Sequence, residues 1–418
     1  MRVVDVFADL RARGLVQDST DAEALAGRLA SGPVTAYVGF DPTAESLHVG
    51  NLVGILVLRR LADTGHRAIA LAGGATGMIG DPSGKSEERN LLDAETLARN
   101  LAGLRGQLER LAGAEMVDNA TWTAPMTLLE FLRDVGKHVP VNAMLAKESV
   151  RSRMAGEEGI SFTEFSYMLL QANDYRHLHV DRGCELQAGG SDQWGNITAG
   201  IDLIRRTTGH AVHGFTWPLL LRSDGRKFGK SEAGNVWLSA ERTSPYRFFQ
   251  YWMQVPDDDV ERFLLQLTLL RVEEALAVAA EHAAAPQHRE GQRRLAREVT
   301  ALVHGPAAAA ATEAASAVLF GAELDDLEAG TLATLEEEVP TVSIGSLDDG
   351  VDLVDLLVQS GLAGSRKDAR RTIDEGGAYV NNRRRSAEDT LVTPADLREE
   401  RYVLLRKGKR SYALVRTG

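Results

Sequence analysis

Two short stretches of the sequence combine glycine with polar or basic side chains that can bind phosphate. The first, 41–51, reads DPTAESLHVGN and connects a strand-like segment, VTAYVGF, to an apolar segment of helical character, LVGILVLRRLADTG. A helix start has free backbone N–H groups that bind anions, and Ser46 is the expected N-cap. His48 and Asn51 are three residues apart and share one side of the first turn, while Gly50 leaves room for a flat ring. Taken alone, the stretch fits a capping turn with a structural histidine at least as well.

The second stretch, 227–231, reads KFGKS and places two lysines within four residues on a glycine-containing segment. Lysine is scarce in this chain, with 8 residues against 39 arginines, so the pair is a departure from the composition. A lysine is a compact cation on a flexible stem that suits phosphate binding, and a loop can close over a transition state and open again. A solvated surface loop is the alternative interpretation of this stretch alone.

The elements that would position these stretches alternate between strand and helix over roughly the first half of the chain. Short apolar segments that end in glycine or a turn, namely VTAYVGF, HRAIALAGG and GCELQAGG, are separated by helix-like segments such as TEFSYMLLQANDYRHL. This alternation predicts an α/β fold with a parallel sheet covered by helices. Ligands of such sheets bind at the carboxyl ends of the strands, and the polar, glycine-rich stretches follow the strands here.

The composition is that of a globular protein with two or three domains. The chain has 418 residues, of which 44% are hydrophobic and 25% charged, and a net charge of -12. Its single cysteine, Cys184, excludes an internal disulfide and a cysteine-rich zinc site. The sequence has no apolar run long enough to predict a membrane helix, and its N-terminus lacks the features of a targeting segment, so we expect a cytoplasmic protein.

Charge is distributed unevenly along the chain. Residues 362–418 hold 14 Lys and Arg against 8 Asp and Glu, although the whole chain is acidic. This asymmetry predicts a separate basic module attached to an acidic body, and a solvated arginine-rich tail is the alternative.

Considered together, the two stretches match the HIGH and KMSKS signatures of class I aminoacyl-tRNA synthetases. The longer segments YVGFDPTAESLHVGN, GGATGMIGDPSGKSEERN, TEFSYMLLQANDY and LQAGGSDQWGNI resemble the bacterial type of tyrosyl-tRNA synthetase. The resemblance spans nearly the whole chain, and the C-terminal module is similar to the RNA-binding domain first seen in ribosomal protein S-four.

The resemblance implies a division of the chain into five parts. It implies a Rossmann-like, parallel-sheet catalytic domain over 1–222, a KMSKS-type loop region over 223–245 and an α-helical, tRNA-contacting domain over 246–322. A linker over 323–345 and a small α+β RNA-binding domain over 346–418 would complete the chain.

The implied reaction has two steps. Tyrosine attacks the α-phosphate of ATP, which gives tyrosyl-adenylate and pyrophosphate, and the tRNA 3′ end then takes the tyrosyl group. The catalytic residues implied by the family motifs are Thr43, His48, Asn51, Lys227, Lys230 and Ser231. The residues implied for tyrosine are Tyr37, Asp81, Tyr167, Gln171, Asp174 and Gln187. The residues implied for ATP are Asp41, Gly50, Gly190, Asp192, Gln193 and Lys230. We expect ATP to bind together with Mg²⁺, and we expect no metal that is held by protein ligands.

The resemblance also implies macromolecular partners. The C-terminal module is expected to bind tRNA-Tyr by contacts to its phosphates and by its shape. A basic patch is better suited to this kind of recognition than to reading base edges. The residues expected to bind RNA are Arg366, Lys367, Arg370, Arg371, Arg383 and Arg384. The family is homodimeric, and the segments FLRDVGKHVPVNAMLAKESV and SFTEF fall where the relatives pair. No membrane partner is expected.

Three positions depart from the family pattern. Asn51 stands where HIGH has its second histidine, so its amide can donate a hydrogen bond but carries no charge. Val38 stands where many relatives have a cysteine facing the ribose, and KFGKS replaces KMSKS with both lysines kept. These changes bear on rate and ATP affinity rather than on the reaction.

Other interpretations remain open at this point. Asp81 lies in DPSG, which is a turn signal by itself. The spacing of His177 and His179 suggests a metal pair, but no third ligand is apparent, so we interpret the two histidines as structural. The rival functions are a tryptophan-specific relative, a non-catalytic RNA-binding paralogue and a nucleotidyltransferase. Tyr37 with Asp174, which match the family's phenol-binding pair, favour tyrosine over tryptophan.

Overall fold

The computed structural model describes residues 5–81, 93–155, 159–224, 228–231, 234–323 and 329–418. Its contacts divide the chain into two compact units, which are described separately. Unit 1 comprises residues 1–242 and 255–292, and unit 2 comprises residues 243–254 and 293–418. Among the described residues, no helix is long and apolar enough to cross a membrane.

Unit 1 is built on a five-stranded parallel sheet with the order β3-β2-β1-β4-β5. The strands are β1 (Thr35–Phe40), β2 (Arg67–Ala72), β3 (Glu115–Asp118), β4 (Cys184–Gly190) and β5 (His213–Trp217). The chain runs outward from β1 to β3 and then returns to the other side of β1 with β4. The point where the strand order reverses is therefore between β1 and β4, which is where ligands bind in open α/β sheets. This sheet confirms the predicted α/β fold class.

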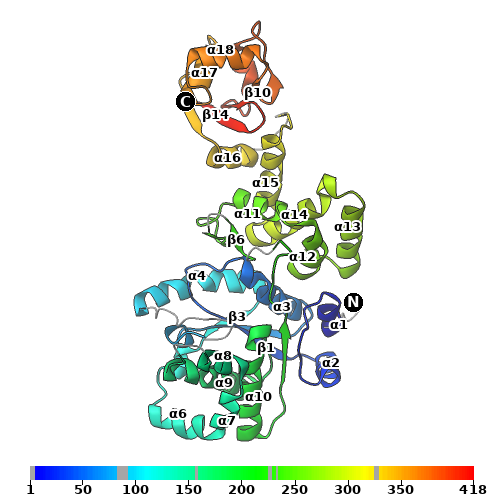
Figure 1. Cartoon of the computed structure of the whole chain (residues 1–418), viewed down its shortest axis with the longest axis vertical. Coiled ribbons are helices and arrows are strands. Elements are labelled where there is room, and N and C mark those ends of the chain that lie inside the picture. Colours follow the sequence, from blue (N-terminus) through cyan, green and yellow to red (C-terminus); the bar gives the residue numbers. More distant parts are fainter. Residues whose placement is uncertain (1–4, 82–92, 156–158, 225–227, 232–233, 324–328) are drawn as a thin grey trace. The chain divides into compact units, whose positions relative to one another are not determined.

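Helices cover both faces of the sheet (Figure 1). On one face lie α3 (Leu52–Asp63) and α4 (Ala94–Ala112), and on the other lie α9 (Phe162–Arg182) and α10 (Trp194–Thr208). Residues 52–58 are all buried, because this segment is apolar around its whole circumference. Helix α9 begins where the Ser161 side chain accepts a hydrogen bond from the Glu164 N–H, and it ends at Gly183, whose φ is 63°.

Shorter helices complete unit 1. They are α1 (Val6–Ala12), α2 (Ala22–Ser31), α5 (Ala120–Thr123), α6 (Leu128–Asp134), α7 (Val141–Leu145), α8 (Glu148–Met154), α12 (Val260–Leu267) and α13 (Val272–Ala284). A two-stranded ribbon, β6 (Lys230–Ser231) with β7 (Gly234–Asn235), carries part of the second stretch. Helices α6 and α7 pack through Phe131 and Met144 against the cluster that includes Met168 and Leu203 of α9 and α10.

Unit 2 joins helices to a second sheet. Its helices are α11 (Pro245–Met253), most of α14 (Glu290–His304), α15 (Pro306–Leu319), α16 (Ala329–Glu338), α17 (Leu353–Gln359) and α18 (Arg366–Asp374). The sheet has the order β11-β10-β13-β14-β8, with β8 (Thr341–Ile344), β10 (Ala378–Val380), β11 (Arg383–Arg384), β13 (Tyr402–Lys407) and β14 (Ser411–Thr417). A separate pair is formed by β9 (Val351–Asp352) and β12 (Leu391–Val392). The helices and short strands of the C-terminal part confirm the expected α+β architecture.

The segment 323–345, which the sequence predicts to be a linker, is structured where it is described. Leu332 and Leu335 of α16 are buried in a cluster with Leu404 and Leu414, and β8 pairs in parallel with β14. The segment is acidic and weakly patterned, but its few apolar residues supply the contacts that hold it. The other predicted domain boundaries stay predictions.

Candidate active site

A cavity of about 350 Å³ lies at the carboxyl ends of β1 and β4, where the strand order reverses. Most of the residues that the sequence predicts for tyrosine, ATP or catalysis line it. They are Tyr37, Asp41, Thr43, His48, Gly50, Asn51, Asp81, Tyr167, Gln171, Asp174, Gln187, Gly190, Asp192 and Gln193. Lys230 is exposed and does not line this cavity, Lys227 lies outside the described residues, and so does the side chain of Ser231.

The first stretch forms a short 3-10 turn, Val49–Asn51, that leads into α3. His48, and not Ser46 as expected, is the N-cap: the Gly50 N–H donates to His48 Nδ1 at 3.0 Å, and Asn51 Oδ1 accepts from the His48 N–H at 3.1 Å. The Ser46 hydroxyl instead accepts from the Gln107 amide and from the Ser239 N–H. Sequence reasoning missed this because an imidazole nitrogen can accept a capping bond as an oxygen does.

The protonation of His48 follows from these contacts. Burial and the nearby Lys230 lower the pKa of His48 below its usual value, which favours the neutral ring. Because Nδ1 accepts from the Gly50 N–H, the proton of the neutral ring is on Nε2. His48 therefore offers a single N–H donor, which can bind a phosphate oxygen without carrying charge.

The second stretch packs directly against the first. The Val49 N–H donates to the Val236 carbonyl at 3.0 Å, and the Leu238 N–H donates to the Leu47 carbonyl at 2.8 Å. A Cβ added at Gly229 would lie 3.3 Å from Val49 Cγ2 and 3.5 Å from the Gly50 nitrogen, so the two backbones approach closely there. Backbone hydrogen bonds thus fix the segment after KFGKS beside the turn that carries His48.

Asp174 is a buried carboxylate that lines the cavity, with 2% of its surface exposed. Its oxygens accept from Asn119 Nδ2 at 2.9 Å and from Trp122 Nε1 at 2.8 Å. Burial raises the pKa of Asp174 to about 7, although these two donors oppose the rise. The Tyr37 hydroxyl is also buried, and it has no hydrogen-bond partner among the described residues. The site therefore holds polar groups that a ligand's own hydroxyl could satisfy.

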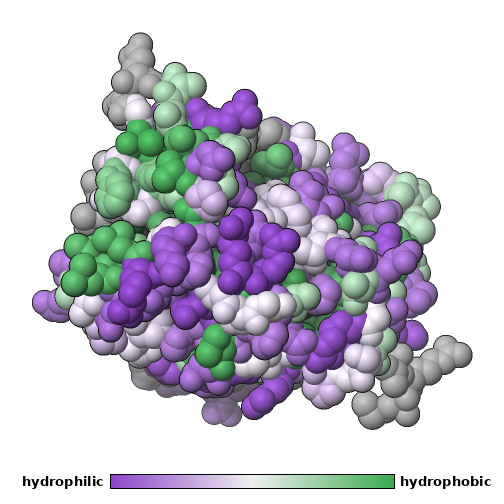
Figure 2. Space-filling view, turned by 90° about the horizontal axis from the view of Figure 1, so that it is seen from below, coloured by the Kyte–Doolittle hydropathy of each residue, from purple (hydrophilic) through white to green (hydrophobic). Residues whose placement is uncertain are grey.

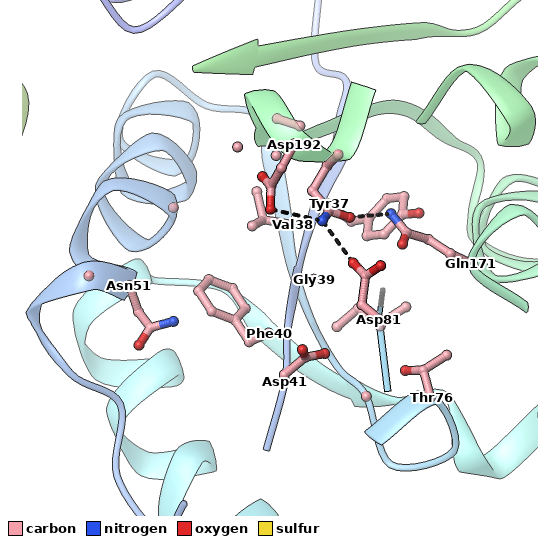
Figure 3. A pocket seen from close by; sticks show the side chains of 18 of the residues that line it. Tyr37, Val38, Gly39, Phe40, Asp41, Asn51, Thr76, Asp81, Gln171 and Asp192 are labelled. Atoms are coloured by element: carbon pink, nitrogen blue, oxygen red, sulfur yellow. Dashed lines mark hydrogen bonds between the residues drawn. The ribbon is translucent and has the colours of Figure 1, made fainter. Parts of the chain in front are cut away.

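Figure 3 shows Asp81, Gln171 and Asp192 pointing toward one another inside the cavity. The amide of Gln193 joins them: its Nε2 donates to Asp81 Oδ2 at 2.8 Å and to Asp192 Oδ2 at 3.5 Å, and its Oε1 accepts from Gln171 Nε2 at 3.2 Å. Asn196 Nδ2 also donates to Gln171 Oε1 at 3.0 Å. Burial raises the pKa of Asp192, and its neighbour Asp81 adds to the rise. Two carboxylates held this close create a site for a cation or for hydroxyl donors.

The remaining predicted residues line the cavity in different states of burial. Tyr167 is 5% exposed and Gln187 is 2% exposed, and the Oε1 atom of Gln187 has no partner among the described residues. Thr43 is exposed. A Cβ added at Gly190 would lie 2.7 Å from Asp192 Oδ1, so a larger residue there would displace that carboxylate.

Asn119 and Trp122 were missed by the sequence analysis, as was Thr76, whose hydroxyl accepts from Asn119 Nδ2 at 3.0 Å. Asn119 and Trp122 follow β3 directly, and β3 was not predicted as a strand. The pattern that indicated the other polar stretches, polar residues directly after the carboxyl end of a strand, would also indicate these residues.

The basic residues predicted for RNA lie in unit 2. Arg366, Lys367, Arg370 and Arg371 are exposed on α18, and Arg383 and Arg384 are exposed on β11. Arg366 pairs with Asp355 and Arg371 with Asp368. Arg385, by contrast, is mostly buried between Asp389 and Asp396 and has a structural role.

The two histidines with metal-like spacing have other contacts. His177 stacks on Trp122 with ring centroids 4.4 Å apart, and His179 contacts the Cys184 carbonyl and His210.

Comparison with known proteins identifies the family. A family model described as tRNA synthetases class I (W and Y) matches residues 29–321. The chain belongs to this family. A second model, the tyrosine–tRNA ligase SYY-like C-terminal domain, matches residues 331–415.

The relatives of this class I synthetase extend over its full length. The tyrosine–tRNA ligase of Opitutus terrae is 53% identical over 421 residues, which cover 98% of this chain and 99% of the relative. That of Mycobacterium leprae is 52% identical, with 98% of each chain covered. The solved structure of a C-terminally truncated mitochondrial tyrosyl-tRNA synthetase from Aspergillus nidulans is 31% identical, with a TM-score of 0.70 over 76% of this chain and 94% of that one. The predicted resemblance and the enzyme class are confirmed.

Proposed function

We propose that this class I synthetase is a tyrosine–tRNA ligase that joins L-tyrosine to tRNA-Tyr through a tyrosyl-adenylate. The observation that carries the proposal is a buried pair that lines the cavity. It consists of the Asp174 carboxylate and the Tyr37 hydroxyl, which has no hydrogen-bond partner in the described part of the chain. The full-length relatives that carry the name tyrosine–tRNA ligase support it.

Selection of tyrosine follows from unpaired polar groups. A phenol hydroxyl can donate to Asp174 and accept from Tyr37, so each buried group gains a partner. Phenylalanine fills the same volume but leaves both groups unpaired, which costs binding free energy. Asn119 and Trp122 hold the Asp174 carboxylate in one orientation through its other lone pairs. The substrate ammonium group is proposed to lie near Asp81, Tyr167 and Gln171, where the carboxylate supplies the opposite charge.

Activation of tyrosine requires charge to move toward pyrophosphate. A tyrosine carboxylate oxygen attacks the α-phosphorus, the bond from that phosphorus to the bridging oxygen breaks, and the electron pair leaves with pyrophosphate. The Nε2 proton of His48, the Thr43 hydroxyl and the helix start are proposed to bind the phosphates, and Lys230 with Lys227 to bind the pyrophosphate. Asp192 and Gly190 are proposed to hold the ribose, with Asp41 and Asn51 near the nucleotide.

ATP is proposed to enter as its Mg²⁺ complex. No group of three or more His, Cys, Asp or Glu side chains that could hold an ion is found in the described part of the chain. The phosphate oxygens and water would then supply the metal's ligands, as is usual for Mg²⁺ bound with a nucleotide.

The α18 and β11 residues are proposed to bind tRNA-Tyr by its phosphates. Each phosphate that a Lys or Arg neutralises adds roughly 0.7 to 0.9 to the slope of log affinity against log salt. Replacing Lys367 and Arg370 by Gln should therefore weaken tRNA binding at low salt and flatten this slope by about 1 to 2. An unchanged slope in filter-binding titrations would remove these residues from the interface.

A homodimer is proposed through an apolar surface on unit 1. Leu128, Leu129 and Leu132 of α6 are 71%, 77% and 51% exposed, and Phe162 at the start of α9 is 80% exposed. Figure 2 shows the face that includes α6 and α7, and green side chains gather on one side of it. Exposed apolar groups in this number mark an interaction surface. A hollow of about 340 Å³ beside α7, lined by Val139 and Met144 among others, adds to this surface.

The cytoplasmic location stays a prediction.

One assay tests the proposed function and separates it from its rivals. ATP–pyrophosphate exchange is measured with tyrosine, with tryptophan, with phenylalanine and without an amino acid. We expect exchange with tyrosine only. Exchange with tryptophan alone would support the tryptophan-specific rival, and no exchange at all would support a non-catalytic RNA-binding protein.

A variant tests the role given to Asp174. Asp174→Ala should abolish most tyrosine-dependent exchange, because the phenol loses its acceptor and the Asn119 amide is left without this partner. The matched control is Asp181→Ala, an exposed carboxylate on the same helix, which should leave exchange unchanged. If Asp174→Ala retains wild-type discrimination against phenylalanine, the assignment is wrong.

A further inference from the structure

Helix α12 is bound at its first turn to the residues that precede the KFGKS stretch. Asp259, the residue before α12, is 2% exposed, and its Oδ2 accepts from the Ser223 N–H at 2.9 Å and from the Ser223 hydroxyl at 3.0 Å. Its other oxygen accepts from Arg262, whose guanidinium also donates to the Leu221 carbonyl. A buried carboxylate with three donors has a strongly determined position, since each lost bond leaves a buried polar atom unpaired.

The same helix contacts the KFGKS stretch itself. Phe263, which is fully buried, packs its ring edge-to-face against Phe228 with centroids 5.2 Å apart and an interplanar angle of 64°. Phe228 is the second residue of KFGKS and precedes Gly229, whose backbone lies against Val49. A shift of Phe228 would therefore change the position of Lys230 relative to the turn that carries His48.

The other end of α12 is bound by two buried arginines. Arg13 donates to the carbonyls of Leu265 and Leu270 at 2.9 and 2.8 Å, and Arg60 donates to the Thr268 carbonyl at 2.6 Å. These cations sit at the negative end of the helix dipole and satisfy carbonyls that the helix leaves unpaired. Arg60 belongs to the last turn of α3, and the first turn of α3 follows His48 and Asn51. Helix α12 is therefore tied at one end to the helix of the first stretch and at the other end to the second stretch.

We propose that α12 is the fixed support that sets the position of Lys230 relative to His48, and that Asp259, Ser223 and Phe263 are positioning residues for tyrosine activation. The inference rests on the proposed function, because it concerns the rate of adenylate formation. Phosphoryl-group chemistry is sensitive to placement, and misplacement of a charged group by about 1 Å costs on the order of 100-fold in rate. None of these three residues lines the cavity, so tyrosine binding does not depend on them directly.

The test uses the full-length protein and separates rate from binding. Asp259→Asn keeps the size of the side chain but offers one acceptor oxygen in place of two, and Ser223→Ala removes one donor. We expect each variant to lower the kcat of tyrosine-dependent pyrophosphate exchange by about 10- to 100-fold. The Kd for tyrosine, measured by equilibrium dialysis without ATP, should change less than about twofold. The double variant should be no worse than Asp259→Asn alone, because both changes break the same contact.

A matched control and a folding control keep the result interpretable. Asp258→Asn removes the neighbouring, exposed carboxylate and should leave kcat unchanged. If Asp259→Asn does not fold, as judged by circular dichroism, Ser223→Ala alone decides the matter, since its side chain is exposed. A kcat equal to that of the control, or an equal loss of kcat and tyrosine affinity, would overturn the inference. Absence of tyrosine-dependent exchange in the wild type would instead overturn the proposed function, and this inference with it.

Discussion

The fold changes the acid–base chemistry of the Asp174 carboxylate. In the unfolded chain it ionises near its ordinary value, whereas burial in the folded protein raises its pKa to about 7. The unfolded state therefore loses this proton at lower pH than the folded state does. Ionisation of Asp174 then lowers stability progressively as the pH rises from about 4 to about 7, and the loss is complete and constant above pH 7. The buried charge therefore lowers the stability of the folded protein above this pH range.

Removal of that charge should stabilise the protein in a pH-dependent way. Asp174→Asn keeps the shape and an acceptor oxygen but cannot ionise. Its free energy of unfolding, relative to wild type and without tyrosine, should rise by about 2 to 3 kcal/mol between pH 5 and pH 8. Urea unfolding at the two pH values measures this, with Asp181→Asn as the exposed control. A constant difference between variant and wild type at the two pH values would show that Asp174 does not titrate in this range.

Gly50 should be required for the geometry of His48. A Cβ at this position would lie 2.6 Å from His48 Cε1, so the imidazole would have to move away from the Gly50 N–H that it accepts from. Gly50→Ala is expected to lower the kcat of pyrophosphate exchange by about 10- to 100-fold, with little change in the Kd for tyrosine.

The matched control for that change is Gly106→Ala on α4, where an added Cβ has open space. It should leave kcat unchanged and stabilise the helix by about 0.5 to 1 kcal/mol. Full activity in Gly50→Ala would mean that the imidazole can move without loss of its role.

Single residues were predictable from the sequence where they belong to a continuous motif. His48, Gly50 and Asn51 lie within four residues, and their family pattern indicated them together. The capping role of His48 was not predictable, because it depends on which imidazole nitrogen accepts the Gly50 N–H. Asn119 and Trp122 were missed for a different reason: the short strand before them was not recognised, and they contact Asp174 from more than 50 residues away in sequence.

At the scale of elements, the turn between β10 and β11 joins the C-terminal sheet to a helix. Asn382 adopts a left-handed backbone with φ of 62°, and its Nδ2 donates to the carbonyls of Val318 and Ala322 at 2.8 and 2.6 Å. Asn is tolerated in this conformation better than most residues. The side chain thus binds one carbonyl in the last turn of α15 and one just after the helix, from a turn that few residues could form.

Loss of this side chain should destabilise unit 2. Asn382→Ala is expected to lower the free energy of unfolding by about 2 to 4 kcal/mol, through lost hydrogen bonds and a strained backbone. Asn382→Gly removes the same bonds without the strain and should cost about 1 to 2 kcal/mol less than the alanine variant. Equal losses in urea unfolding would show that the left-handed conformation contributes nothing.

Elements were predictable where the hydrophobic pattern was strong. The segments that form β1, β2 and β4 are short, largely apolar and end in glycine or a turn, and the first two turns of α3 are apolar all round. The strand β3 is only four residues long and has an acidic residue at each end. Likewise α16 and β8 lie in acidic sequence, and their order depends on contacts with β13 and β14 that are distant in sequence.

At the scale of the whole molecule, the apolar surface of unit 1 decides the expected assembly. Leu129→Glu should convert the proposed dimer to a monomer in sedimentation velocity, because a buried unpaired carboxylate at an interface is costly. Phe320→Glu is the matched control, since Phe320 is as exposed as Phe162 but belongs to unit 2. A wild type that sediments as a monomer at micromolar concentration would exclude the dimer.

The reversal of strand order in the unit 1 sheet also has a consequence for how the chain folds. Tyr37 on β1 is paired with Gln187 on β4, and about 150 residues of chain must close into a loop before those strands meet. Closing a long loop costs chain entropy before the contacts between its ends can stabilise it, so such strand pairings form late and slowly. A nascent chain could complete β1, β2 and the helix after His48 while still lacking Asp174, Gln187 and Asp192. Substrate recognition should therefore arise in one late step of folding, and tyrosine present during refolding would bind only chains that have completed it.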